Sequence, residues 1–187
     1  MENIKEFLNT HYENAIRLKE RFKKTEPKEW TPLIVICELN VQYGHLINTI
    51  HHNAYLEERG RNIVNTNDEI SDVLLQLSYL SYLENINIDN IDKYKNEDID
   101  IEYAIILIGQ LTEAIMEKEN YRYNKERIGF NNIDDFIEDR IFRLFTIIGN
   151  FSKKNKINII KEFDLMLDDA NNFLDNYVQK KYILSKH

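Results

Sequence analysis

Three polar residues in the segment after residue 65 share one side of a predicted helix. Glu69, Asp72 and Gln76 occupy positions i, i+3 and i+7, and the period of a helix brings such positions onto one face. Two carboxylates and an amide therefore point the same way. Oxygen donors of this kind can hold a divalent cation or activate a water molecule. The alternative is a solvated helix face, which is the commonest place for paired acids.

A second polar face lies upstream, within an otherwise apolar segment. Glu38, Gln42 and His45 occupy positions i, i+4 and i+7. If the two segments pack as a helical hairpin, their polar faces meet, and oxygen donors with one imidazole surround a central point. Such an arrangement binds a divalent cation inside a helical bundle. For His45 the alternative is a buried histidine hydrogen-bonded to a carboxylate.

The elements that must position these residues are all expected to be helices. The chain has two prolines, Pro27 and Pro32, and five isolated glycines among 187 residues, which is the pattern of an all-α protein. Apolar periodicity predicts six main helices. The first is expected from residue 4 to before residue 25, the second from 32 into the 51–52 region, and the third from its caps in 65–68 through the apolar face that ends at residue 80. The others are expected at about 101–118, at 134–151 and from 159 to beyond 177, with a short helix after residue 89.

Two of these helices have predicted details that bear on the site. The second begins with Thr31 as N-cap and Pro32 as its first residue, and the third is capped within residues 65–68. The apolar face expected for the second helix consists of Ile34, Cys37, Val41 and Leu46.

The second half of the chain resembles the first at three places. Residues 44–46 (Gly-His-Leu) match residues 109–111 (Gly-Gln-Leu), Asp72 with its apolar run matches Asp139, and residues 85–88 match residues 156–159. The three offsets are 65, 67 and 71 residues. This order predicts an internal duplication, with one helical unit in residues 1–90 and a second in residues 91–187 of a single compact domain. Chance similarity between amphipathic helix pairs is the alternative.

The first unit resembles the MazG-type, all-α nucleoside triphosphate pyrophosphohydrolase superfamily, which includes the dimeric dUTPases. That family has a Glu-x-x-Glu pair on one helix and a Glu-x-x-Asp pair on the next, and an apolar run follows the second pair. Glu69 and Asp72 match the second pair, which holds magnesium in the family. The resemblance implies metal-dependent cleavage of a nucleoside triphosphate to a nucleoside monophosphate and pyrophosphate, and a possible homodimer.

The first family pair is changed in this chain to Gln42 and His45. Replacing two carboxylates by an amide and an imidazole weakens a site for the hard Mg²⁺ ion, although Glu38 could compensate and Mn²⁺ tolerates imidazole better. We expect Mg²⁺ or Mn²⁺ to be held by Glu69, Asp72, His45 and Glu38. Glu38 or Glu69 would orient the attacking water.

The second unit keeps one carboxylate at the matching positions, which are Leu107, Gln110, Phe136 and Asp139. We therefore expect at most one metal site, with the second unit acting as a scaffold in place of a partner subunit. The competing hypothesis is a catalytically inactive MazG-like module that binds nucleotide or protein.

Substrate contacts are expected from two groups of side chains. The amides Gln42 and Gln76 lie on the polar faces, and four cations near predicted helix ends could bind phosphate or could simply be solvated. The four cations are Arg59, Arg61, Lys153 and Lys154.

Composition excludes several other classes of function. The net charge of −8 disfavours a nucleic acid polymer as partner. Cys37 is the single cysteine, which excludes an internal disulfide and a zinc site of several thiolates. No apolar run reaches the roughly 18 residues of a membrane span, and the first residues do not resemble a secretory signal, so we expect a cytoplasmic protein without a membrane partner.

Overall fold

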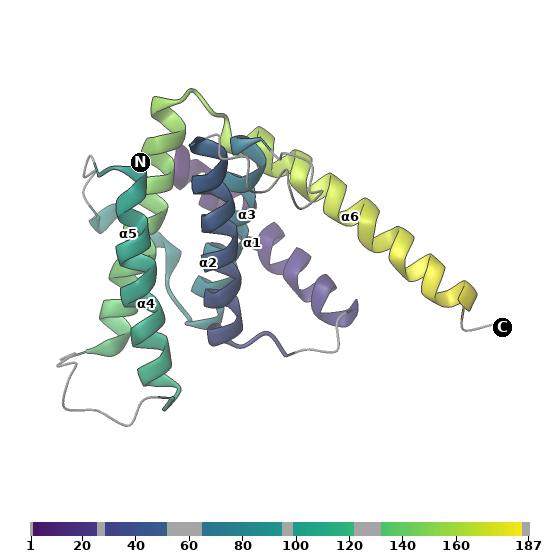
Figure 1. Cartoon of the computed structure of the whole chain (residues 1–187), viewed down its shortest axis with the longest axis horizontal. Coiled ribbons are helices and arrows are strands. Elements are labelled where there is room, and N and C mark those ends of the chain that lie inside the picture. Colours follow the sequence, from purple (N-terminus) through teal and green to yellow (C-terminus); the bar gives the residue numbers. More distant parts are fainter. Residues whose placement is uncertain (1, 26–28, 52–64, 95–98, 122–131, 185–187) are drawn as a thin grey trace.

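The computed structural model describes residues 2–25, 29–51, 65–94, 99–121 and 132–184. Within these ranges the chain is all-helical, without a strand, which confirms the predicted fold class (Figure 1). None of the described helices is long and apolar enough to cross a membrane. The α-helices are α1 (Glu2–Thr25), α2 (Pro32–Ile50), α3 (Thr66–Leu83), α4 (Ala104–Lys118), α5 (Ile133–Lys154) and α6 (Ile159–Leu184), and the 3₁₀ helices are η2 (Ile88–Lys93) and η3 (Ile101–Tyr103).

Local capping sets where the functional helices begin. The Thr31 side chain accepts a hydrogen bond from the backbone N–H of Ile34, and Pro32 is at the first turn of α2, as predicted. The Asn65 side chain accepts from the N–H of Asp68 and so starts α3. Asn132 caps α5 in the same way. Each cap satisfies backbone donors that the first helical turn leaves unpaired.

Helices α3 and α5 end in the same manner. Asn85 and Lys156 have positive φ angles of 56° and 58°. The next residue in each case, Ile86 or Ile157, donates its N–H to a carbonyl five residues earlier, at 2.9 and 2.8 Å. This is the Schellman arrangement, which ends a helix and turns the chain sharply.

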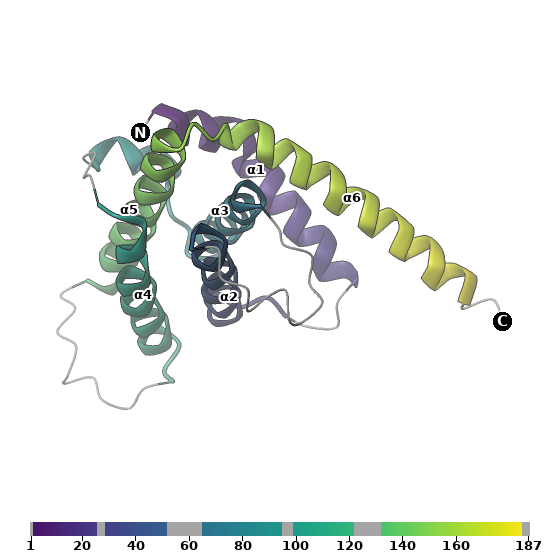
Figure 2. The ribbon, with the colours of Figure 1, turned by 45° about the horizontal axis from the view of Figure 1, so that its top comes forward.

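The helices pack as two pairs flanked by a third. Helix α2 packs against α3, and α4 packs against α5; α2 also contacts α4, and α3 contacts α5. Helix α1 packs against α6 and α3, and the C-terminal part of α6 extends away from the bundle (Figure 2). The largest fully buried side chains join these layers and include Tyr43, Tyr79, Phe7, Phe142, Phe145 and Phe163.

The predicted core face of α2 was partly wrong. Leu46 is buried, but Cys37 is exposed and Val41 is 49% exposed. The buried residues of α2 are Val35, Ile36, Leu39, Tyr43, Leu46 and Thr49. Because α2 is apolar around most of its circumference, spacing alone does not select the buried face, and packing against α3 and α4 does.

Candidate functional site

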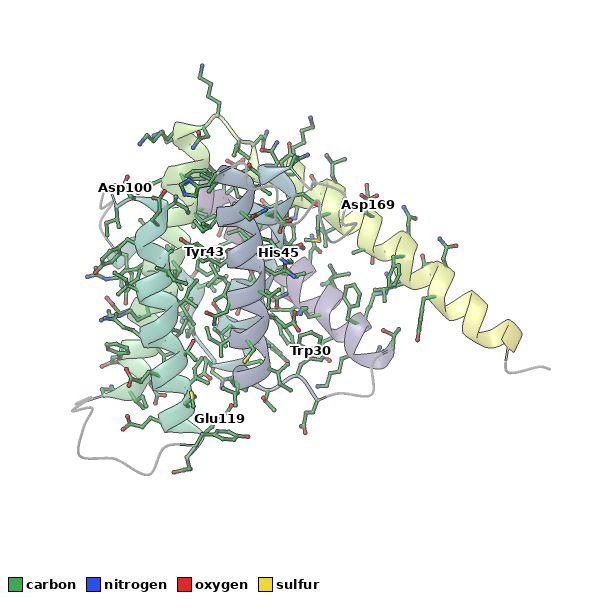
Figure 3. The ribbon with its side chains drawn as sticks, in the orientation of Figure 1. Trp30, Tyr43, His45, Asp100, Glu119 and Asp169 are labelled. Carbon is green, nitrogen blue, oxygen red and sulfur yellow. The ribbon has the colours of Figure 1, made fainter. Side chains whose placement is uncertain are left out.

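The polar faces of α2 and α3 meet near the beginning of α3. The Glu69 side chain is buried, and its Oε2 lies 3.7 Å from Nδ1 of His45. The same ring nitrogen lies 3.2 Å from Oε1 of Gln42. In Figure 3, His45 leaves α2 on the side opposite to Tyr43, whose hydroxyl bonds the Ile101 carbonyl. The structure thus brings Glu69, His45 and Gln42 together.

Asp72 lies one turn further along α3, in a different electrostatic environment. Burial, and after it the charge of Asp68, raise the pKa of its carboxyl to about 6, while Lys19 on α1 opposes both. The pKa of Asp68 is itself raised by burial and by the acids Asp169 and Glu162 of α6. Asp72 therefore lies among carboxylates, with one nearby cation.

Lys19 is the site residue that the sequence reasoning missed. Its side chain is only 3% exposed, and its ammonium lies 3.6 Å from the centroid of the Trp30 ring and 5.8 Å from that of Tyr79. A cation over an aromatic face is attracted by the ring quadrupole. A signal was present, because Lys19 follows Ala15 by four residues and precedes Phe22 by three, and so interrupts the apolar stripe of α1.

Two further polar groups line this part of the molecule. The Gln76 side chain is 5% exposed. Neither its carbonyl oxygen nor the indole N–H of Trp30 has a hydrogen-bond partner among the residues that the structure describes. Buried polar atoms almost always bond a protein group or an ordered water. Gln76 and Trp30 thus add two buried polar atoms to those of Lys19, Glu69 and Asp72.

The remaining predicted residues do not join this cluster. Glu38 is half-buried on α2 and lies about 10 Å along the helix axis from His45. Arg59 and Arg61 lie outside the described residues. Lys153 and Lys154 line a separate open cavity of about 800 Å³ beside η3, together with Asp100 and Glu102 but without Glu69, Asp72 or His45.

The donor set does not fit Mg²⁺. Among the described residues, no three His, Cys, Asp or Glu side chains are grouped so that they could hold a metal ion. Glu69 faces an imidazole, and Asp72 has an ammonium group in its surroundings. Mg²⁺ requires several hard oxygen ligands in near-octahedral geometry, and the positive charge of Lys19, which acts on Asp72, opposes a second cation.

Three of the matching positions in α4 and α5 contact guanidinium groups, which belong to Arg140 and Arg143. Nε of Arg140 donates to Oε1 of Gln110 at 2.7 Å, and the guanidinium lies 4.0 Å from the centroid of the Phe136 ring. Asp139 pairs with Arg140 and with Arg143. Because Asp139 is already paired, α4 and α5 have no free acid at the matching positions.

Comparison with known proteins finds no family model, no curated protein and no solved structure that matches this chain. The assignment of a function therefore depends on the residues of the site.

Proposed function

We propose that this chain is a catalytically inactive MazG-like module, built from two tandem helical units, that acts by binding another protein chain. The observation that carries the proposal is the replacement of the metal ligands. Gln42 and His45 stand where the resemblance expects carboxylates, and the buried ammonium of Lys19 lies over Trp30, with Asp72 within its electrostatic reach.

Electrostatics explains why such a site would not bind a triphosphate. Asp68, Glu69 and Asp72 lie within two turns of α3, and a triphosphate brings several further negative charges. In the family a divalent cation offsets this repulsion. Without that cation, one lysine and one histidine are set against at least three carboxylates. The balance of charges at the site therefore disfavours an anionic nucleotide.

Matching helix ends support the tandem units. The N-cap Asn65 of α3 corresponds to the N-cap Asn132 of α5 at the offset of 67 residues. At the offset of 71, Asn85 and Lys156 share a positive φ and the same Schellman hydrogen bonds. Helix α4 also ends at a positive-φ residue, Asn120. The match between the C-terminal ends of α3 and α5 is therefore less specific alone than together with the match between their N-caps.

Pyrophosphate release from a panel of nucleoside and deoxynucleoside triphosphates, first with Mg²⁺ and then with Mn²⁺, tests the proposal. We expect no release by the wild type. Release that is lost in Glu69→Gln and kept in Glu6→Gln, an exposed acid of α1, would contradict the proposal. Restoring the family carboxylates through Gln42→Glu and His45→Glu, together with Lys19→Met, should create Mn²⁺ binding that the wild type lacks.

One observation favours the second candidate, a metal-dependent nucleoside triphosphate pyrophosphohydrolase. Burial and neighbouring negative charges raise the pKa of both Asp68 and Asp72, and such carboxylates would be relieved by a cation. The same pyrophosphate assay separates the two candidates, because only the hydrolase releases pyrophosphate in a way that depends on Glu69.

A further inference from the structure

A cavity lies at the end of the bundle where α2 and α5 finish and α4 begins (Figure 1). Its volume is about 800 Å³, and small-molecule sites in proteins have volumes of about 300–1,000 Å³. Glu69, Asp72 and His45 do not line it. The cavity is therefore separate from the site described above, and an inference about it goes beyond the proposed function and does not depend on it.

Both signs of charge line this cavity, and they come from different elements. Asp100 and Glu102 lie at η3, just before α4 (Figure 3), whereas Lys153 and Lys154 lie in the last turn of α5. The Glu102 carboxylate lies 3.3 Å from Nε2 of His51. Neither lysine has an ion-pair partner among the residues that the structure describes. Opposite charges that share a cavity without neutralising each other favour a ligand that carries both charges.

The same charges disfavour the phosphate that the sequence predicted for Lys153 and Lys154. A phosphate would be attracted by two ammonium groups but would share the cavity with two carboxylates, whose charges repel it. The formal charges of the two acids and the two lysines cancel. A zwitterion, whose net charge is zero, therefore matches the cavity better than an anion does.

The uncharged part of the lining indicates what joins the two charges of the ligand. Ile50, Ile101 and Phe151 provide an apolar surface, which suits an aliphatic side chain. The carboxamides of Asn150 and Asn155 also line the cavity, and a carboxamide has the donor and the acceptor that a peptide bond requires. Together these groups favour a peptide over a purely apolar link between the charges.

The size of the cavity sets the length of such a peptide. A sphere of 800 Å³ is about 11.5 Å across, and three extended residues span at most about 10–11 Å. A free amino acid holds both charges on one carbon atom and would occupy little of this volume. Three residues therefore fit the cavity from one end to the other.

We propose that the cavity binds a short zwitterionic peptide of about three residues. Its ammonium group lies against Asp100 and Glu102, its carboxylate against Lys153 and Lys154, and its central side chain against Ile101. Both ends of such a peptide are charged at neutral pH, so each end meets the opposite charge.

Isothermal titration calorimetry with the tripeptide Ala-Leu-Ala tests this site. We expect saturable binding of one peptide per chain. N-acetylation of the peptide removes its ammonium charge, and amidation of its carboxyl end removes the other charge. Each change should weaken binding by about three- to fivefold, because the charged side chains of the site are partly exposed and such ion pairs are weak. The blocked peptides test the inference in the unaltered chain.

Two variants assign the ends of the peptide to the two sets of charges. Asp100→Asn should weaken binding of the free peptide but not of the acetylated peptide, which has no ammonium group. Lys153→Met combined with Lys154→Met should weaken binding of the free peptide but not of the amidated one. Neither change removes an ion pair among the described residues, and the Asp100 side chain makes no cap bond in η3, so both variants should fold.

Matched controls lie outside the cavity. Lys23→Met combined with Lys24→Met changes a similar lysine pair in the last turn of α1, and Asp168→Asn changes an exposed acid of α6. Both should bind all three peptides like the wild type, and circular dichroism should show that every variant is folded. The inference would be overturned by a lack of saturable binding, by equal binding of the free and the blocked peptides, by equal losses in the control variants, or by tighter binding of inorganic phosphate than of the peptide at Lys153 and Lys154.

Discussion

Asp72 should destabilise the folded chain at neutral pH. Burial and the charge of Asp68 raise the pKa of its carboxyl from the ordinary value of 3.8 to about 6, even with Lys19 nearby. Between these two pH values the folded state holds a proton that the unfolded state has already lost, and at neutral pH the folded state must carry the carboxylate in an unfavourable environment. Each pKa step corresponds to about 1.36 kcal/mol, so ionised Asp72 lowers the free energy of unfolding by up to about 3 kcal/mol.

The sign of the pH dependence follows from the raised pKa. Below pH 3.8 Asp72 is neutral in both states and has no electrostatic cost. Between pH 3.8 and about 6 the folded state keeps a proton that the unfolded state has lost, so stability falls across this range and levels off above it. Asp72→Asn imitates the neutral carboxyl, so the variant should match the wild type near pH 3.5 and exceed its unfolding free energy at pH 8 by up to about 3 kcal/mol.

Urea unfolding of dilute protein, followed by the fluorescence of the single tryptophan, Trp30, measures this difference. The control is Asp168→Asn, an exposed acid of α6, which should remain within about 0.5 kcal/mol of the wild type at every pH. A loss of stability in Asp72→Asn at pH 8, or a difference that does not change with pH, would refute the reasoning. Stabilisation of the wild type by Mn²⁺ that disappears in Asp72→Asn would favour the hydrolase.

Three further changes should have measurable effects on urea unfolding. Lys118→Met removes the cation that lies 2.7 Å from buried Glu84 and should cost about 1–2 kcal/mol, below the value for a fully buried pair because Lys118 is 37% exposed. Gly149→Ala would place a Cβ in overlap with Cγ1 of Ile4, and this overlap should cost about 1–3 kcal/mol although alanine favours helix. Burial lowers the pKa of His11, against the opposing charge of a nearby acid, so stability should be lost as the pH falls below 6.5; His11→Phe should reduce that loss.

Matched changes distinguish these effects from general damage to the fold. Lys5→Met breaks an ion pair with Asp92 in which both side chains are more than half exposed, so it should cost less than about 1 kcal/mol. Gly109→Ala meets no atom within 4 Å and should stabilise the monomer by up to about 1 kcal/mol. Equal losses in Lys5→Met and Lys118→Met, or in Gly109→Ala and Gly149→Ala, would contradict the assigned contacts. For His11→Phe the contradicting result is an unchanged loss of stability between pH 7 and pH 5.

Helix positions and ends could be predicted because they depend on neighbours in the chain. Thr31, Asn65 and Asn132 cap helices through bonds to residues two or three positions away, so the necessary donors and acceptors are visible in the sequence. The common face of Glu69 and Asp72 follows from the helix period in the same way.

The environment of the site depended on contacts between distant residues. Lys19 and Asp72 are separated by 53 positions, and no local pattern predicts that the two share one region of the bundle. The contact of Glu69 with His45 required α2 and α3 to pack at one particular register. Such contacts decide whether a pair of acids is a metal site or an ion-paired cluster.

The order of residues along the chain was enough to determine an all-α protein, the approximate positions of its helices and the spacing of Glu69, Asp72 and Gln76, because hydrogen bonds within a helix join residues a few positions apart. Packing decided which side of α2 is buried and left Val41 exposed, because a helix that is apolar on several sides can bury any of them. Packing also brought Lys19 within electrostatic reach of Asp72. The charge balance of a buried site is a sum over all neighbouring elements, so it is defined only once the helices have assembled.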